Sequence, residues 1–483
     1  MKIKQETLSI VPQPKNIRRS AGKIKINPEI SIKGTYVTAK ATFRELAEKF
    51  KKIKISGTEE SGNIVFERNE SLAENAYKII VNHSGAIIQA NEEESAINAA
   101  CVLTQMMEKE EKSVLLPLCE ITDYPDCSWR GVMVDLARSW HPVQMLYEYV
   151  DVCAYYRLNR LHLHFTDSES FTLPSRIFPK LSTPGRHYTK DELVALSRYA
   201  KSRGIQVVPE LDIPGHCAAF VSAYGELFGK NGIIAYTERS LQGISDLIAE
   251  ICETFEESDF IHVGGDEAEI AMWLKDEESA QRLKQLYGKE CYGDKELTQR
   301  AYAEFIKFSC EQVLKNKKTP VVWEGFSEKY NGLIPKNSLI ASWENYYQTT
   351  PQLLDAGFNL LNCSWKPLYV VTPKKHWSVE EIYDWNVRTF EATHPDSPFF
   401  EKKYVAENYS QIKGGELLAW GDHIVPLFPT VEAGVREEQK LMFERIPAFA
   451  ENVWNVEKLT DKENFLSRYS NTFSAVKTFS RKQ

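Results

Sequence analysis

Residues 260–267, Phe260-Ile261-His262-Val263-Gly264-Gly265-Asp266-Glu267, form an apolar run that ends in two glycines and two adjacent acids. Neighbouring side chains of a regular strand point to opposite faces. Glycine reaches backbone conformations that other residues avoid, so the glycine pair allows the chain to bend and to turn both carboxylates into one cleft. The segment thus predicts an acid pair at a strand end. Alternatively, Asp266 is the N-cap of a helix and Glu267 lies in its first turn, where negative charge is favoured.

The acid pair ends the fourth of eight apolar runs that alternate with amphipathic helices from Trp129 onward. Such runs are typical of strands buried on both faces of a parallel sheet. Eight strands close a β/α barrel, so we predict an α/β fold in which residues 125–483 form a (β/α)8 TIM barrel with a C-terminal helical segment. The predicted strands are 131–135, 160–165, 206–210, 260–263, 320–323, 339–342, 358–362 and 416–420, with helices between them, for example at 145–156 and 190–201.

Residues 1–124 follow a different pattern, which predicts a small α+β domain. The charged run 108–112 is expected to be a solvated turn, and the stretch 124–126 around Pro125 marks the junction with the barrel. The expected elements of this domain are helices at 39–52 and 93–107 and short strands at 63–67, 77–81 and 86–89.

The composition limits the class of protein and its partners. The 483 residues are 43% hydrophobic, and the nine cysteines lack CxxC spacing, so we expect a large core with buried thiols. The net charge of −8 argues against nucleic acid or an anionic membrane as the main partner. No run reaches the roughly 20 apolar residues of a membrane span. The first residues lack the apolar segment of a signal peptide, which predicts a cytoplasmic protein or an exported one whose signal has been removed.

Polar and aromatic side chains gather where the predicted strands end. The chemistry of β/α barrels lies at the carboxyl ends of the strands, so these side chains are expected to share one site. They are Arg138 after strand one, Asp167 after strand two, His216 after strand three, Asp266 and Glu267 after strand four, and Trp323, Trp343 and Trp420 at the ends of strands five, six and eight.

Two chemistries compete for this site. His162 and His164 stand at i and i+2 on strand two and face the same side, as the metal ligands of an amidohydrolase-like barrel would. That interpretation needs further histidines or a lysine at later strand ends, where tryptophans stand instead, and the two histidines are better explained as hydrogen-bonded structural residues flanking Asp167. Glycoside hydrolysis needs one acid to protonate the leaving oxygen and a second negative group, which Asp266 and Glu267 supply. Two acids this close perturb each other's pKa, which keeps one protonated near neutral pH.

The chain resembles the β-N-acetylhexosaminidases of glycoside hydrolase family 20 over nearly its whole length. The resemblance is carried by RGVMVDLAR at 130–138, NRLHLHFTDSESF at 159–171, VVPELDIPGH at 207–216 and HVGGDE at 262–267, and by VVWE, ASWE and LAWGD around the three tryptophans. It implies a retaining exo-enzyme that removes terminal GlcNAc or GalNAc from a glycan, with no metal or organic cofactor. The resemblance leaves the natural glycan and the oligomeric state open.

Roles follow from the resemblance for individual residues. Glu267 would be the general acid and then the base that activates water, while Asp266 would orient the 2-acetamido group of the substrate as its oxygen attacks the anomeric carbon. The intermediate is then an oxazolinium ion, and the enzyme needs no nucleophile of its own. In the pocket, Arg138 would bind the outer hydroxyls of the sugar, with support from Asp167 and His216. The acetamido group would be enclosed by Trp323, Trp343 and Trp420, and Tyr369 would donate a hydrogen bond to its oxygen. Trp385 would lie on the aglycone side.

Two positions depart from the family pattern. Asp422 stands where many members have a glutamate that reaches the outer hydroxyls, and Val371 stands where an aspartate or asparagine is common. Both departures bear on the preference between gluco and galacto sugars and leave the acid pair intact. The alternatives that remain are release of a disaccharide or of a sulfated amino sugar, a sugar-binding module on an inactive barrel, and the metal-dependent amidohydrolase.

Overall fold

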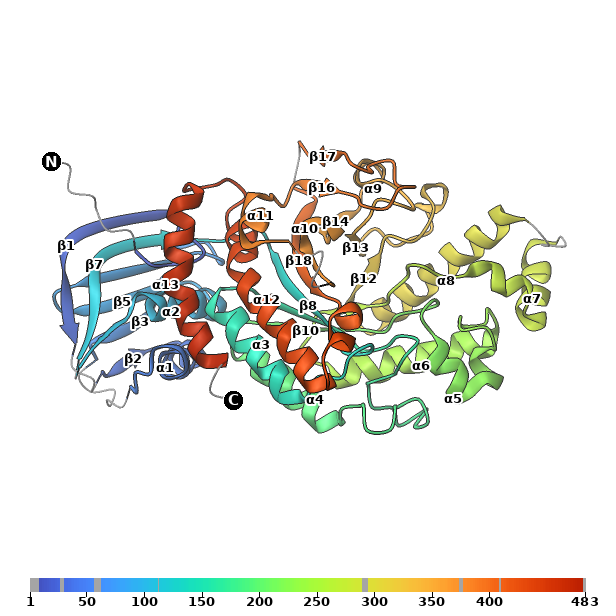
Figure 1. The fold of residues 1–483 in the computed structure, drawn as a ribbon, viewed down its shortest axis with the longest axis horizontal. Helices are drawn as coiled ribbons and strands as arrows, with labels where there is room; N and C mark the ends of the chain where they lie inside the picture. Colours follow the sequence, from blue (N-terminus) through green and yellow to red (C-terminus); the bar gives the residue numbers. More distant parts are fainter. Residues whose placement is uncertain are drawn as a thin grey trace.

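The computed structural model places a small sheet domain beside a parallel barrel that is surrounded by helices (Figure 1). In Figure 1 the N-terminal sheet lies at the left, and helices α7 (Glu277–Tyr287) and α8 (Lys295–Lys315) extend to the right. No helix among the described residues combines the length and apolar character needed to cross a lipid bilayer. The structure describes residues 8–26, 30–55, 62–111, 113–288, 294–372, 377–407 and 410–480.

The N-terminal domain is one mixed sheet packed against two helices, so the predicted small α+β domain is confirmed. Buried and partly exposed side chains alternate along its central strands, as expected for a sheet with one face on a core. Helix α2 (Glu93–Met106) packs on this sheet, and α1 (Val37–Lys51) packs on α2. The strands are β1 (Asn16–Ile26), β2 (Ile32–Gly34), β3 (Ile64–Arg68), β4 (Tyr77–Asn82), β5 (Gly85–Ala90), β6 (Glu108–Glu110) and β7 (Ser113–Asp123), in the order β1-β7-β4-β5-β3-β2 with β6 on β7.

Four of these strands, β1, β2, β6 and β7, were not predicted. Strand β1 is mostly exposed and carries charged residues at many positions, so its sequence lacks the apolar alternation of a half-buried strand. The solvated turn expected at 108–112 is wrong for Glu108–Glu110, which pair with β7 as β6. All three residues of β6 are exposed, which explains their charge. Lys112 lies outside the described residues.

The second domain is a closed barrel of eight parallel strands, as predicted. Each strand pairs with the next in sequence order, and the eighth strand pairs with the first to close the ring. All eight predicted strands are present, with ends that differ by a few residues. They are β8 (Trp129–Asp135), β9 (Arg160–His164), β10 (Gln206–Glu210), β11 (Phe260–His262), β12 (Thr319–Trp323), β13 (Leu339–Ser342), β14 (Asn359–Asn362) and β18 (Ile412–Ala419).

The barrel helices include the two that the sequence predicts, α3 (Val143–Tyr155) and α4 (Lys190–Lys201). Helix α4 begins at a capping box, in which Thr189 and Glu192 satisfy each other's backbone N–H groups. The remaining helices of this part are α5 (Ala218–Phe228), α6 (Glu238–Thr254) and α9 (Thr350–Asp355), together with α7 and α8.

An insertion between β14 and β18 shapes the mouth of the barrel. Strand β14 pairs only with the first half of β18, and the two-residue strand β15 (Tyr369–Val370) pairs with the second half, at Leu418 and Ala419. The seventh and eighth strands therefore diverge at their carboxyl ends, and β15 fills the gap between them. The insertion also contains α10 (Trp365–Leu368), α11 (Val379–Asp384), β16 (Thr389–Glu391) and β17 (Lys403–Val405).

The C-terminal helices α12 (Val431–Trp454) and α13 (Lys462–Ser480) connect the two domains, and Figure 1 shows α13 against the N-terminal domain. The indole of Trp454 donates to Asp123, at the end of β7. Buried Arg157 pairs with the same carboxylate at 2.7 Å and lies over the Trp454 ring. A buried carboxylate shared by an indole and a guanidinium fixes the end of the N-terminal sheet to the barrel.

The eight cysteines in the described residues are buried free thiols, as expected, and Cys291 lies outside those residues. Burial raises the pKa of the Cys101 thiol to about 12, which makes it unreactive near neutral pH. These cysteines therefore act as small apolar side chains.

Candidate active site

A cavity of about 330 Å³ opens at the carboxyl ends of the barrel strands. It brings together most of the residues that the sequence predicts for the site, although they come from strands far apart in the chain. Its lining comprises Arg138, His164, Asp212, His216, Asp266, Glu267, Trp343, Trp365, Tyr369, Val371, Thr372, Trp420, Asp422 and His423.

The glycine pair after β11 makes the bend that the sequence predicts. Gly264 and Gly265 have φ angles of +67° and +97°, and Glu267 itself lies at +46°. A Cβ atom on Gly264 would lie 1.9 Å from Oδ1 of Asp212, so neither the conformation nor the space allows a side chain there. No described helix begins at Asp266, which excludes the helix-cap alternative. Both carboxylates instead line the cavity.

The two acids have opposite electrostatic environments. Burial raises the pKa of Asp266 to about 7, and the nearby negative charge of Glu267 adds to this effect against the opposing charge of His216. Its Oδ1 atom is buried and has no hydrogen-bond partner among the described residues. The hydrogen bond from His216 holds the pKa of Glu267 below its usual value. At neutral pH Asp266 is therefore about half protonated in the free protein, whereas Glu267 is ionised.

His216 connects Glu267 to the buried carboxylate of Asp167. Its Nε2 lies 3.5 Å from Oε2 of Glu267, and its Nδ1 lies 3.2 Å from Oδ1 of Asp167. Burial alone would lower the pKa of this imidazole, but the carboxylates of Asp212, Asp167 and Glu267 raise it to about 12. His216 is therefore an imidazolium in contact with the exposed acid. Its backbone φ of +52° lies in the left-handed region, which residues other than glycine rarely adopt.

Arg138 lines the cavity, whereas Asp167 is buried outside its lining and pairs with Arg138. The guanidinium of Arg138 lies 2.8 Å from Asp167 and 3.0 Å from Asp135, and it stacks over the ring of Trp420. Burial would raise the pKa of Asp167, but hydrogen bonds from His164 and His216 hold it well below its usual value. This arrangement presents a fixed, planar cation to the cavity, which suits the recognition of neighbouring hydroxyl groups.

Asp422 and Val371, the two departures from the family pattern, both line the cavity. Burial raises the pKa of Asp422, and the charge of Arg138 opposes this shift. His423 lies beside it, with Nε2 3.3 Å from the Asp422 carboxylate. The cavity lining therefore differs from the common pattern at positions 371 and 422.

The aromatic residues divide into those that line the cavity and those that do not. Trp343, Tyr369 and Trp420 line it, and the rings of Tyr369 and Trp420 lie 5.9 Å apart. Trp323 is only 1% exposed and lies beneath Trp420, with its indole N–H donating to Glu210 at 2.6 Å. It therefore supports the wall of the cavity without forming its surface.

Trp385 does not line this cavity either. It is 5% exposed, and its indole N–H donates to the carbonyl of Thr389. It lines a separate cavity of about 320 Å³ together with Lys366 and Trp377. Trp385 therefore packs within the insertion and does not share a cavity with the acid pair.

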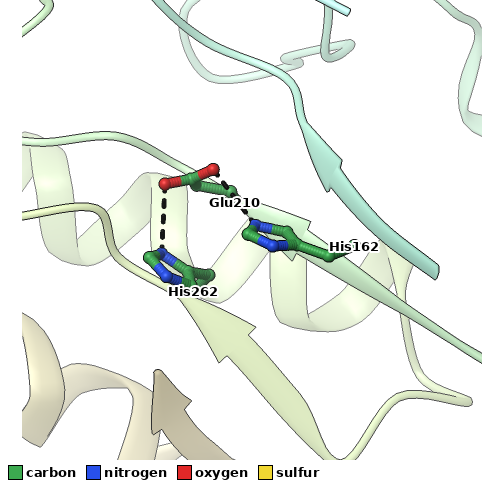
Figure 2. Close-up of side chains that lie close together, drawn as sticks. All are labelled: His162, Glu210 and His262. Atoms are coloured by element: carbon green, nitrogen blue, oxygen red, sulfur yellow. Dashed lines mark hydrogen bonds and ion pairs between the residues drawn. The ribbon is translucent and has the colours of Figure 1, made fainter. Parts of the chain in front are cut away.

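His162 and His164 belong to a buried hydrogen-bonded network. Figure 2 shows Glu210 between His162 and His262, with a distance of 3.1 Å to a nitrogen of each ring. The other nitrogen of His162 lies 2.9 Å from Glu416. His164 lies between Glu210 and Asp167, so it flanks Asp167 as the structural interpretation predicts. These groups have spacings that could suit a metal ion. Both ring nitrogens of His162 and of His164, and Nδ1 of His262, however, already lie at hydrogen-bonding distances from carboxylates.

The structure adds cavity residues that the sequence interpretation missed. Trp365 lies between β14 and the predicted site residue Tyr369, and its backbone N–H donates to the carbonyl of Trp343. The rule that functional residues follow strand ends would have found it. Asp212 follows β10 and is buried, and burial together with the charge of Asp266 raises its pKa well above the usual range. His164, Thr372 and His423 complete the lining.

The chain is similar to proteins of known class. A β-hexosaminidase of Vibrio furnissii is 26% identical over 382 residues, which cover 70% of this chain and 60% of the relative. One of Akkermansia muciniphila is 27% identical over 433 residues, covering 82% of each chain. The chain spans about three fifths of the length of the first of these relatives. The structure of an exo-β-N-acetylglucosaminidase from Vibrio harveyi, 21% identical, superposes with a TM-score of 0.81 over 97% of this chain and 77% of that one, which shows a shared fold.

Family models match both domains. Residues 7–124 match domain 2 of glycosyl hydrolase family 20, and residues 127–457 match its catalytic domain. The second match alone covers more than half of the chain. It includes every residue that lines the cavity with the acid pair. The chain therefore belongs to glycosyl hydrolase family 20.

Proposed function

We propose that the protein is a retaining exo-β-N-acetylhexosaminidase that removes terminal β-linked GlcNAc or GalNAc by substrate-assisted catalysis. The observation that carries the proposal is that Asp266 and Glu267 open into one cavity walled by Trp343, Tyr369 and Trp420. The volume of about 330 Å³ is near the lower limit for ligand pockets, which favours one sugar over a disaccharide. Aromatic walls suit the methyl of an acetamido group.

In the first step the acetamido oxygen attacks the anomeric carbon while Glu267 gives a proton to the leaving glycosidic oxygen. The buried Oδ1 of Asp266, which has no partner among the described residues, is available to accept a hydrogen bond from the acetamido N–H. Ionised Asp266 then stabilises the positive charge of the oxazolinium ion. Tyr369 donates to the acetamido oxygen and holds it in line for attack.

In the second step Glu267, now a carboxylate, removes a proton from water as the water attacks the anomeric carbon. The oxazolinium ring opens, the acetamido group is restored, and two inversions give net retention. The proton taken from water restores the acid form of Glu267, so no other group has to supply one. The imidazolium of His216, 3.5 Å away, stabilises the Glu267 carboxylate between the two steps. Arg138 and Asp422 hold the outer hydroxyls of the sugar, and neither takes part in proton transfer.

The test compares four aryl β-glycosides, those of GlcNAc, GalNAc, 6-sulfo-GlcNAc and lacto-N-biose, with the aryl β-glucoside, which lacks the acetamido nucleophile. We expect turnover of the GlcNAc or GalNAc compound, no measurable turnover of the glucoside, and a β-configured first product by NMR. Turnover of the glucoside at a comparable rate would contradict substrate assistance. Binding of GlcNAc in calorimetry without turnover of any acetamido glycoside would instead identify a sugar-binding module.

A further inference from the structure

Two neighbouring tyrosines lie exposed on the loop after β13, outside the cavity lining. Tyr346 and Tyr347 are 40% and 36% exposed, and their ring centroids lie 4.9 Å apart. The same loop carries Trp343, which faces the cavity. We infer that Tyr346 and Tyr347 form the platform that binds the leaving-group sugar of the substrate. This inference rests on the proposed function, since it requires Glu267 to protonate a glycosidic oxygen.

The contact between Tyr347 and Glu267 indicates on which side of the cavity the leaving group lies. The Tyr347 side chain makes a hydrogen bond with the backbone of Glu267, and burial together with the charges of Asp266 and Glu267 raises its pKa. The Glu267 side chain is 54% exposed, so it lies at the mouth of the cavity. The glycosidic oxygen must meet this carboxyl. The leaving group therefore passes outward beside Glu267, toward the exposed tyrosines.

Buried hydrogen bonds hold the loop in one conformation. The carboxylate of Glu324 accepts the backbone N–H of Tyr346 at 2.8 Å and the hydroxyl of Ser342 at 2.6 Å. Asn345 has a φ of +54°, and its side-chain oxygen accepts the N–H and hydroxyl of Thr350. The left-handed turn at Asn345 precedes the two tyrosines, and Glu324 fixes the chain just after it. A platform that is already rigid loses little entropy when a sugar binds.

A second loop extends the aromatic surface. The ring of His394 lies 4.6 Å from that of Tyr346, and the backbone N–H of Asp396 donates to its Nδ1. Buried Glu344 fixes this loop by accepting the N–H groups of Thr393 and His394. Three exposed rings thus form one surface beside Glu267. Flat apolar faces of this kind bind the C–H faces of pyranose rings.

The placement of Trp385 supports the same assignment. The family resemblance gives the aglycone side to this tryptophan, yet it is buried in the insertion and lines a different cavity. Among the described aromatic residues near Glu267, Tyr346 and Tyr347 have the exposure that contact with a leaving group requires. In this chain the loop after β13 takes the place that the resemblance assigns to the Trp385 segment.

The experiment compares two substrates that differ only in the leaving group. In N,N′-diacetylchitobiose the leaving group is a GlcNAc residue, and in N-acetyl-β-glucosaminyl fluoride it is a single atom. The variants are Tyr346→Ala, Tyr346→Phe, which keeps the ring, and the control Tyr124→Ala, which removes a tyrosine of similar exposure, 42%, at the domain junction. The quantity measured is kcat/KM for the disaccharide divided by kcat/KM for the fluoride.

We expect this ratio to fall about tenfold in Tyr346→Ala, the loss typical of one aromatic contact, and to stay within twofold of wild type in the other two variants. An unchanged ratio in Tyr346→Ala would overturn the platform, as would an equal loss on both substrates, which indicates a merely structural role. If the wild type hydrolyses the fluoride and not the disaccharide, the platform is wrong while the proposed function stands. If it hydrolyses neither, the proposed function fails, and the inference with it.

Discussion

Nε2 of His216 lies 3.5 Å from Oε2 of Glu267, and the other nitrogen of the same ring lies 3.2 Å from Asp167. The ring therefore joins the exposed acid to a buried carboxylate. Because the pKa of His216 is about 12 and that of Glu267 is lowered by the same contact, the two side chains share a proton that the pair retains well above neutral pH. Glu267 can act as an acid at pH 7 only while this shared proton is present.

His216→Asn should remove the shared proton. Glu267 alone would lose its proton near the ordinary pKa of a glutamate, about 4.3. We expect kcat/KM at pH 7 to fall roughly 100-fold or more, and the alkaline limb of the pH profile to move to lower pH. Measurement of kcat/KM from pH 4 to pH 10 checks this, with exposed His83, in the turn between β4 and β5, replaced by Asn as control. A parallel loss at every pH, with no shift of the limb, would contradict the shared proton.

Glu267→Gln removes the acid itself and keeps its size. Loss of a general acid costs roughly 100-fold or more, and we expect at least that loss with an aryl N-acetyl-β-glucosaminide. The loss should be larger for a disaccharide, because a sugar alcohol leaves less readily than a phenol without protonation. Steady-state kinetics on both substrates measure this. Activity within tenfold of wild type on the aryl substrate would show that Glu267 is not the acid.

The barrel could be predicted from the sequence because its strands are buried on both faces, and the resulting apolar runs stand out. The same reasoning missed β1, which is exposed and charged along most of its length. It also missed β15, because a two-residue strand has no periodicity and depends on the divergence of β14 and β18. Pairing between distant segments, and not local pattern, creates both elements.

The site was predicted to a similar extent and for a related reason. The end of a strand can be located from the sequence pattern, and residues that follow strand ends were predicted to share one site. Arg138, His216 and the acid pair do line one cavity. The sequence does not show how deep a side chain lies beyond that end. Trp323 and Trp420 both end strands, yet the first is buried under the second. Trp385 lies in an insertion whose path no strand pattern specifies, and its position followed only from the family resemblance.

Asp266→Asn separates stability from activity. The pKa of Asp266 is about 7 in the folded protein and near 3.8 in the unfolded chain, so ionisation as the pH rises from about 4 to 7 destabilises the fold. Asparagine does not ionise, and the difference in Tm between the variant and the wild type should grow in favour of the variant over this range. Activity should fall roughly 100-fold, because an amide supplies no negative charge to the oxazolinium ion. Thermal unfolding at pH 4, 6 and 8 measures the first effect, and an unchanged Tm difference would contradict the raised pKa.

Gly264→Ala tests whether the bend itself positions the acids. An alanine Cβ at this position would lie 1.9 Å from Oδ1 of Asp212, and the φ of +67° adds a cost of about 1–2 kcal/mol for any residue other than glycine. The bend must shift to relieve the clash, and it carries both Asp266 and Glu267. We therefore expect a lower Tm and a loss of at least about tenfold in kcat, since small displacements of catalytic groups are costly. Gly332→Ala is the matched control, because a Cβ there meets no atom within 4 Å. If Gly264→Ala lowers the Tm and keeps full kcat, the geometry of the acid pair does not depend on this bend.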